Sequence, residues 1–550
     1  MARAPGIVEA SSNTISEPID DIPLLLTYLH RIGLQQSIDH HFHSDLSDSD
    51  VSLGRLLVIW LAHMLTQSKR QARHLRSWVA SHQFTLQRYM GQQIPISAVS
   101  DIRLHKALTA LGDDAAWLQF EAAFNTQLVA LHKIRDEHVR LSAASGQLYL
   151  TSEGILQFDQ GRRWWSGAIG LRLTVCQLYP SRLPITIVAA DVSDQRSAVT
   201  AAALQHIRSA ISAQRAIYVS NSELKGDLRA TLRACGDGYV CQLDRGTLLA
   251  TLTHTAQQSL QHLVGGTPEA PGDHFADGYE FDSDPAQEDW QERRILVRNF
   301  AQLHQQNRDL EERLGAAQIE LAALNERRRG KRRPRSLAEM QSAVEAILAQ
   351  YAVEGLLQVA YVETSDTRIV RRYRGRPTMP RTEHVVSINT ALDEAAVQAY
   401  RQQLGWRIFA SNVPADELPI DEVAQIELEL PSLIRRVCGK PLSITAGIVH
   451  HEPQIRGLIR FVSLAMRTLA LIDEALYHRA MEVGLEPYDK TSGNGQQLLA
   501  ERLLEAYKEL TLTVISEGYE RRYHVTTLSS VQRRMLEVLG LPASIYTVRQ

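Results

Sequence analysis

A run of strand-like segments in the middle of the chain constrains the fold most. Three consecutive segments are rich in β-branched and aromatic residues: Val139–Leu150, Ala168–Tyr179 and Pro184–Asp191. Helical and strand-like runs then alternate: Ala198–Gln214, Ala216–Val219, Asp227–Ala234 and Tyr239–Leu243. Consecutive strands followed by strand–helix–strand alternation predict an α/β fold, with a mixed sheet flanked by helices.

The first part of the chain divides into a short tail and a helical domain. Residues 1–20 are mostly small and polar, and we expect them to form a flexible tail. From Asp21 to about Glu137, apolar residues recur at the spacing of a helix. The first such group is Leu24, Leu25, Tyr28, Leu29 and Ile32. This pattern predicts an all-helical N-terminal domain.

The middle of the chain combines a polar stretch with a long helix. Residues 265–289 are rich in Gly, Pro, Asp and Glu, which predicts a solvated loop. In the helix that follows, apolar residues occupy the a and d positions of a heptad pattern: Leu296, Leu303, Leu310, Leu314, Ala317, Leu321 and Leu324. A second helix, Leu337–Tyr351, can fold back on the first, and we favour this internal hairpin over pairing with another chain. The segment Leu356–Asn389 is strand-rich.

The C-terminal third returns to alternating elements. The segment GWRIFASN (405–412) has the pattern of a strand that enters a turn. Helical segments are expected at Ile420–Leu430, Gly457–Arg479, Leu498–Leu510 and Ser529–Leu539, with a strand-like stretch at Leu512–Ile515. We therefore expect a mainly helical segment at the C-terminus.

Composition limits the classes of function. The 59 Lys and Arg residues nearly balance the 62 Asp and Glu residues, which excludes binding to DNA through a polycationic chain, so a basic nucleic-acid site must be local. The four cysteines form no CxxC pair, and we interpret them as the reduced thiols of a cytosolic protein. The N-terminus lacks an apolar signal segment, and no apolar stretch has the pattern of a membrane span. We expect a cytoplasmic protein without a membrane partner.

Several short segments, in order and spacing, together resemble a bacterial insertion-sequence transposase of the DDE type. They are IYVSNSEL (217–224), DWQERRILVRNF (289–300), ALNERRRGK (323–331), VEGLL (353–357), GWRIFASN (405–412), GKPLSI (439–444) and GLIRFVSLAMRTLAL (457–471). The resemblance implies an RNase H-like core that is interrupted by an insertion. The implied parts are a tail (1–20), a helical domain (21–137), the first part of the core (138–264), an insertion with the long helix and basic runs (265–403), the second part of the core (404–480) and a C-terminal helical segment (481–550).

The resemblance also locates three positions where a DDE enzyme carries carboxylates. Two divalent cations about 3.5–4 Å apart need anionic oxygen ligands to cleave a phosphodiester. The first Asp is expected directly after Leu141, where this chain has Ser142; the second is expected after IYVS, where it has Asn221. The Glu is expected eight residues before Gly439, at Pro431. These residues carry no negative charge, so we predict no catalytic residues and no metal site.

Other carboxylates are the alternative that keeps an active enzyme open. Glu223, Asp159 and Asp191 lie near predicted strand ends. Glu429 is two residues from Pro431, so on a helix it points away from that face. The second hypothesis is therefore an active DDE transposase with non-family metal ligands, which would require Mg²⁺. Under the first hypothesis no cofactor is expected.

Two basic runs are the candidate contacts for double-stranded DNA. The first run contains Arg327, Arg328, Arg329, Lys331, Arg332, Arg333 and Arg335. The second contains Arg371, Arg372, Arg374 and Arg376, flanked by Arg368 and Arg381. Arginine contacts with phosphates produce salt-dependent affinity. A solvated helix end would explain one run, but two runs inside one insertion of a near-neutral chain favour DNA.

Three functions follow from these observations. The leading hypothesis is a catalytically inactive, transposase-derived DNA-binding protein of the cytoplasm and nucleoid. The second is the active transposase described above. The third is an interaction scaffold without a role on DNA, in which the leucine pattern serves assembly, for example as a homodimer. Clustered histidines, such as His40, His41 and His43, are interpreted as surface or capping residues.

Overall fold

The computed structural model describes most of the chain. The described residues are 13–43, 51–66, 75–132, 138–150, 156–159, 169–179, 181, 183–191, 207, 215–220, 223–255, 260–267, 270–283, 291–326, 336–370, 379–424, 451–477, 499–517 and 520–547. The chain divides into two compact units: unit 1 is Met1–Cys241 with Glu427–Gln550, and unit 2 is Gln242–Ile426. Unit 2 begins earlier and ends later than the insertion expected at 265–403. Among the described residues, no helix has the length and apolar character needed to cross a membrane.

Helices build the N-terminal part of unit 1. They are α1 (Ile22–Arg31), α2 (Leu34–His41), α3 (Leu53–Thr66), α4 (Leu75–Ser81), α5 (Gln83–Met90), α6 (Asp101–Leu111) and α7 (Asp114–His132), with a short 3-10 helix η2 (Ile96–Val99). The apolar residues that predicted the first helix, from Leu24 to Ile32, are buried. The helical character expected from Asp21 onward is thus confirmed, because apolar spacing is a local signal that needs no knowledge of distant partners.

The two ends of the chain differ from the expectation. The strand β1 (Asn13–Pro18) lies in what was expected to be a flexible tail, and it pairs antiparallel with β14 (Thr511–Glu517). The strand β14 covers the strand-like stretch expected at Leu512–Ile515, and its hairpin partner β15 (Glu520–Val525) was not expected in the mainly helical C-terminal segment. The helical elements there are α16 (Leu499–Glu505), α17 (Ser530–Val538) and the 3-10 helix η4 (Ala543–Tyr546). A pairing between residues almost 500 positions apart leaves no signal in local composition.

The strands of unit 1 form a mixed sheet. In spatial order they are β5 (Pro184–Asp191), β4 (Ile169–Tyr179), β2 (His138–Leu150), β6 (Ile217–Ser220) and β7 (Gly238–Gln242), while β3 (Leu156–Asp159) pairs with β2. The strand β4 is antiparallel to both β5 and β2, whereas β6 runs parallel to β2 and β7 runs parallel to β6. Helix α9 (Gly226–Ala234) connects β6 to β7. The mixed α/β class is therefore confirmed. The predicted helix 198–214 falls almost wholly outside the described residues.

The buried side chain of Arg467 links helix α15 (Glu452–Tyr477) to helix α7 and to this sheet. Arg467 and Glu121 of α7 form an ion pair, and their side chains are only 1% and 4% exposed. The same guanidinium donates hydrogen bonds to the carbonyl oxygen of Ile185 on β5 at 2.6 Å and to Asn125 Oδ1 at 3.2 Å. A third hydrogen bond runs from Arg467 Nη1 to Ser463 Oγ on α15 itself at 2.7 Å, so the buried guanidinium has the partners that a buried charge requires.

Unit 2 contains four antiparallel strands, two of which lie where the sequence predicted a loop. Their order is β13 (Trp406–Ser411), β10 (Arg293–Asn299), β9 (Ala270–Asp282) and β8 (Gln261–Thr267), with helix α10 (Arg245–Thr255) before them. Residues 265–289 were expected to be a solvated loop, but β8 and β9 occupy much of that range. Gly278 explains part of the error: a Cβ there would lie 2.6 Å from Ile420 Cδ1, so this glycine serves close packing on a strand instead of a turn.

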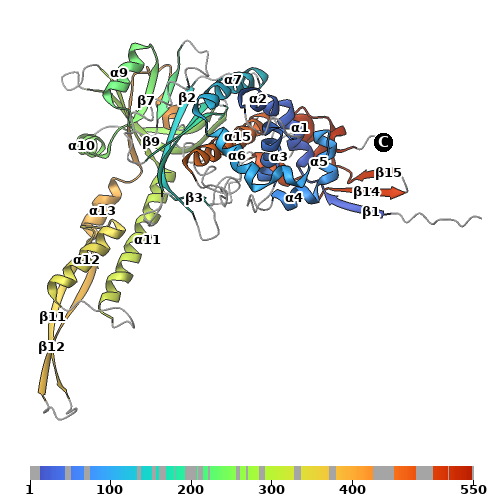
Figure 1. Ribbon diagram of the computed structural model, residues 1–550. Coiled ribbons are helices and arrows are strands. Elements are labelled where there is room, and N and C mark those ends of the chain that lie inside the picture. The colour runs from blue at the N-terminus through green and yellow to red at the C-terminus, as the bar shows by residue number, and fades with distance from the viewer. Residues whose placement is uncertain are drawn as a thin grey trace, which may run out of the picture. The chain divides into compact units, whose positions relative to one another are not determined.

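A helical hairpin and a β-hairpin form the rest of unit 2. Helix α11 (Phe300–Leu324) packs on α12 (Leu337–Tyr351), and the strands β11 (Leu357–Val370) and β12 (Met379–Leu392) continue beyond the helices, as Figure 1 shows, before α13 (Glu394–Gln402). The heptad residues from Leu310 to Leu321 are buried against Met340, Val344 and Ile347. The internal hairpin interpretation is thus confirmed. Leu296 lies on β10 and not on the helix.

Candidate nucleic-acid interface

The structure brings together the backbone next to two of the three positions where the resemblance implies carboxylates. Ser142 lies on β2, where the structure describes its backbone, while Asn221 and Pro431 lie outside the described residues. The strands β2 and β6 are parallel, and Leu141 pairs with Ser220. Ser142 directly follows Leu141, and Asn221 directly follows Ser220. The register thus places Ser142 level with the carboxyl end of β6, the edge where ligands of parallel strands gather.

The alternative carboxylates on the sheet lie at other levels. Asp191 pairs with Leu171, which pairs with Gly146, so Asp191 is four residues from the level of Ser142, roughly 13 Å along the strand. Asp159 pairs with Gln147, five residues from Ser142, or roughly 17 Å. Metal ligands must converge within a few ångströms. The backbone register therefore separates both carboxylates from the level of Ser142. Glu223 is exposed and follows β6 after two residues that are outside the described range.

The β11–β12 hairpin carries the described part of the second basic run. Its base belongs to the core of unit 2 through Leu357, Val386 and Ile388. Toward its turn, Arg368 and Arg381 are directly opposed in the register. Opposed residues share a face, and two like charges in that arrangement repel each other.

An acidic pair of residues lies next to this arginine pair along the hairpin. Asp366 and Glu383 are also directly opposed, two residues closer to the base of the hairpin than Arg368 and Arg381. On a strand, positions two apart share a face, so the acidic pair adjoins the arginine pair. The hairpin thus changes from apolar to acidic to basic along its length.

The remaining predicted DNA contacts fall outside the described residues. These are Arg327, Arg328, Arg329, Lys331, Arg332, Arg333 and Arg335 of the first run, and Arg371, Arg372, Arg374 and Arg376 of the second. The chain positions that flank them are described. The first run separates α11 from α12, and the second joins β11 to β12. Both runs therefore connect consecutive elements of one compact unit, which the sequence alone could not establish.

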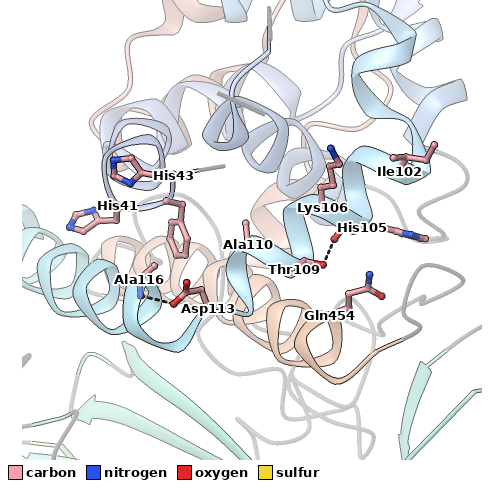
Figure 2. A pocket seen from close by; sticks show the side chains of 11 residues that line it. His41, His43, Ile102, His105, Lys106, Thr109, Ala110, Asp113, Ala116 and Gln454 are labelled. Carbon is pink, nitrogen blue, oxygen red and sulfur yellow. Dashed lines mark hydrogen bonds between the residues drawn. The ribbon is translucent and has the colours of Figure 1, made fainter. Parts of the chain in front are cut away.

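Unit 1 contains a pocket that the sequence did not predict. It has a volume of about 610 Å³ and lies among α2, α6, α7 and the start of α15, as Figure 2 shows. Its polar lining includes His41, His43, His105, Lys106 and Asp113. Asp113 Oδ1 accepts hydrogen bonds from the backbone N–H groups at the start of α7, at 2.9 and 3.0 Å. The carboxylate is thus engaged by the helix, and the rest of the polar lining is basic or neutral. Clustered histidines near residue 40 were the signal, but partners from α6 could not be anticipated.

Comparison with known proteins yields no assignment. No protein-family model matches the chain, and no curated protein matches it.

Proposed function

We propose that this chain is a transposase-derived DNA-binding protein that has an RNase H-like core and lacks the two-metal nuclease site. One observation carries the proposal: Leu141 pairs with Ser220 in parallel strands. The resemblance selected Ser142 and Asn221 independently, from segments far apart in the sequence. Their neighbours are nevertheless paired, as two metal-binding positions of one site would need to be.

The order of the strands supports the same proposal. The RNase H-like fold implied by the resemblance has three antiparallel strands, followed by two strands that run parallel to the first. The strands β2, β4 and β5, followed by β6 and β7, have these directions and the spatial order 3-2-1-4-5 when numbered along the chain. Such a sheet is a scaffold and not a function, so the chemistry must be argued from the residues.

The residues at the expected site argue against catalysis. Ser142 offers a hydroxyl group, Asn221 offers an uncharged amide, and Pro431 offers no side-chain ligand. Two divalent cations beside a phosphodiester require anionic ligands. The register also separates Asp159 and Asp191 from the level of Ser142. The proposal therefore assigns the protein a binding role in the cytoplasm, on the nucleoid.

A salt titration of DNA binding tests the binding role. The protein is titrated against a labelled duplex of mixed sequence at several salt concentrations, beside a variant in which the six arginines of the second run and its flanks are replaced by glutamine. These residues are Arg368, Arg371, Arg372, Arg374, Arg376 and Arg381. The slope of log affinity against log salt should become shallower by about 0.9 for each arginine that contacts a phosphate. The control replaces the exposed Arg533 and Arg534 of α17 with glutamine.

Three outcomes would contradict the proposal in different ways. An unchanged slope in the hairpin variant would remove the second basic run from the interface. Absence of any binding at low salt would favour the interaction scaffold. Strand cleavage above background with Mg²⁺ or Mn²⁺ would instead favour an active transposase. A mock preparation from cells that do not express the protein controls for a contaminating nuclease.

A further inference from the structure

Two histidines and one aspartate converge on the β8–β9 hairpin of unit 2. His262 lies on β8, while His274 and Asp277 lie on β9. The Oδ1 atom of Asp277 is 2.8 Å from His262 Nδ1 and 2.9 Å from His274 Nε2. The three ligand atoms all lie within 4.8 Å of one another. The arrangement offers two imidazole nitrogens and one carboxylate oxygen at a single point on the surface.

An irregularity in the strand pairing creates this convergence. His262 is directly opposite Asp277, and Leu263 is opposite Ala276, but Val264 is opposite His274. One residue, Phe275, is therefore extra on β9, which is the definition of a β-bulge. Residues three apart on a regular strand point to opposite faces. The bulge shifts the alternation by one residue, so His274 and Asp277 reach the same face. Bulges often re-aim a side chain next to a functional site.

Neighbouring side chains hold the cluster in place. The ring of His274 packs edge-on against Phe300, the first residue of α11, with a centroid distance of 4.9 Å. The rings of His262 and His274 are also edge-to-face, at 4.7 Å. Arg298, which pairs with Asp277 from β10, has its guanidinium over the Trp406 ring, 5.5 Å from the centroid. Arg298, the cationic residue paired with Asp277, therefore interacts with the ring of Trp406 on β13.

We infer that His262, His274 and Asp277 form a binding site for a divalent transition-metal ion such as Zn²⁺. Two imidazoles and one carboxylate suit Zn²⁺ and its transition-metal neighbours, whereas Mg²⁺ and Ca²⁺ prefer oxygen ligands alone. Ligand atoms about 2.1 Å from a tetrahedral ion stand ~3.4 Å apart, so the nitrogen–oxygen separations must widen by about half an ångström. The His262 side chain is 74% exposed and the His274 side chain 39%, which leaves both rings room to turn.

The three protein ligands leave a fourth position open toward solvent. Structural zinc sites close all four positions with protein ligands, whereas three ligands leave one position for water or another small ligand. His262 lies on β8 and the other two ligands lie on β9, so a bound ion would also link these two strands. The inference concerns unit 2 alone and does not depend on the proposed DNA-binding role.

Cobalt and zinc titrations of the full-length protein test the inference. The protein is first freed of metal by chelation and dialysis. Co²⁺ binding is followed by its visible absorption bands, and Zn²⁺ affinity by competition with a chromophoric chelator. The variants are His262→Ala, His274→Ala and Asp277→Asn, and the matched control is His524→Ala, which removes another exposed histidine on a strand. Circular dichroism verifies that each variant is folded.

The expected result is a Co²⁺ spectrum in the unchanged protein and in the His524 control, and its loss in the His262 and His274 variants. Zn²⁺ affinity at this site should fall by at least about tenfold, or ~1.4 kcal/mol, for each ligand variant. An unchanged Co²⁺ spectrum and Zn²⁺ affinity in both histidine variants would overturn the inference. So would the absence of metal binding in the unchanged protein, because the cluster would then be only a hydrogen-bonded His–Asp–His network.

Discussion

Replacement of the buried Asp21 with asparagine should stabilise the protein relative to the unchanged chain, and this gain in stability should be larger at pH 8 than at pH 5. Asp21 precedes α1 and is fully buried. Its Oδ1 atom accepts a hydrogen bond from the Thr66 hydroxyl. Within the part of the chain that the structure describes, its Oδ2 atom has no hydrogen-bond partner. Burial raises the pKa of this carboxyl from 3.8 to about 7.

The sign of the effect follows from proton binding. Between pH 3.8 and about pH 7 the folded chain holds a proton on Asp21 that the unfolded chain has lost. The stability contributed by the protonated carboxyl is therefore complete below pH 3.8 and disappears as the pH rises through about 7. A shift of about three units corresponds to about 4 kcal/mol over the whole range, of which about 3 kcal/mol is lost between pH 5 and pH 8.

Urea unfolding at both pH values measures this difference. The tryptophans of the N-terminal helices, Trp60, Trp78 and Trp117, provide the fluorescence signal. Asp21→Asn keeps the oxygen that accepts from Thr66 and cannot ionise, so its advantage over the unchanged chain should grow by about 3 kcal/mol from pH 5 to pH 8. The exposed Asp101 is the control, because Asp101→Asn removes a charge from the surface instead of the core. An Asp21→Asn advantage that is equal at the two pH values would refute the reasoning.

Two further substitutions test the packing of α15. Glu121→Ala should destabilise the protein by about 3–5 kcal/mol in urea unfolding, because it leaves the buried Arg467 guanidinium without its carboxylate; a loss below 1 kcal/mol would contradict this. Gly457→Ala should cost about 1–3 kcal/mol, since its Cβ would lie 1.9 Å from the Leu108 carbonyl oxygen and force α15 away from α6. Gly315→Ala on α11 meets nothing within 4 Å and should instead stabilise by about 0.5–1 kcal/mol, through helix propensity. The same sign for both alanines would disprove the steric argument.

Local patterns in the sequence predicted the elements whose partners are close along the chain. Helix α12 was expected at Leu337–Tyr351 and has these bounds. Ser336 caps its first turn, because the Ser336 hydroxyl accepts a hydrogen bond from the Glu339 N–H at 3.2 Å. The three consecutive strands also lie within a few residues of their predicted positions. In each case the signal was periodicity or capping chemistry inside one segment.

Elements that depend on distant or irregular pairing were missed. The strand β1 is short and polar, and it exists through its pairing with β14 at the other end of the chain. The strand β9 contains Pro271, Gly272 and Gly278, which are typical of turns, and its pairing with β8 and β10 overrides that composition. The cluster of His262, His274 and Asp277 was missed for the same reason. His274 and Asp277 lie in the range 265–289 that was expected to be a loop, and only the bulge at Phe275 brings them to one face.

The lack of charge at Ser142 and Asn221 bears on what the proposed scaffold needs to remain folded. Two carboxylates on adjacent strands repel each other unless cations lie between them. With Ser142 after Leu141 and Asn221 after Ser220, that repulsion is absent. The helix α15 is held to β5 and α7 by the Arg467–Glu121 pair, which needs no metal. The core of the proposed DNA-binding protein therefore does not depend on a metal at these positions, and selection can act on other residues without preserving the chemistry of cleavage.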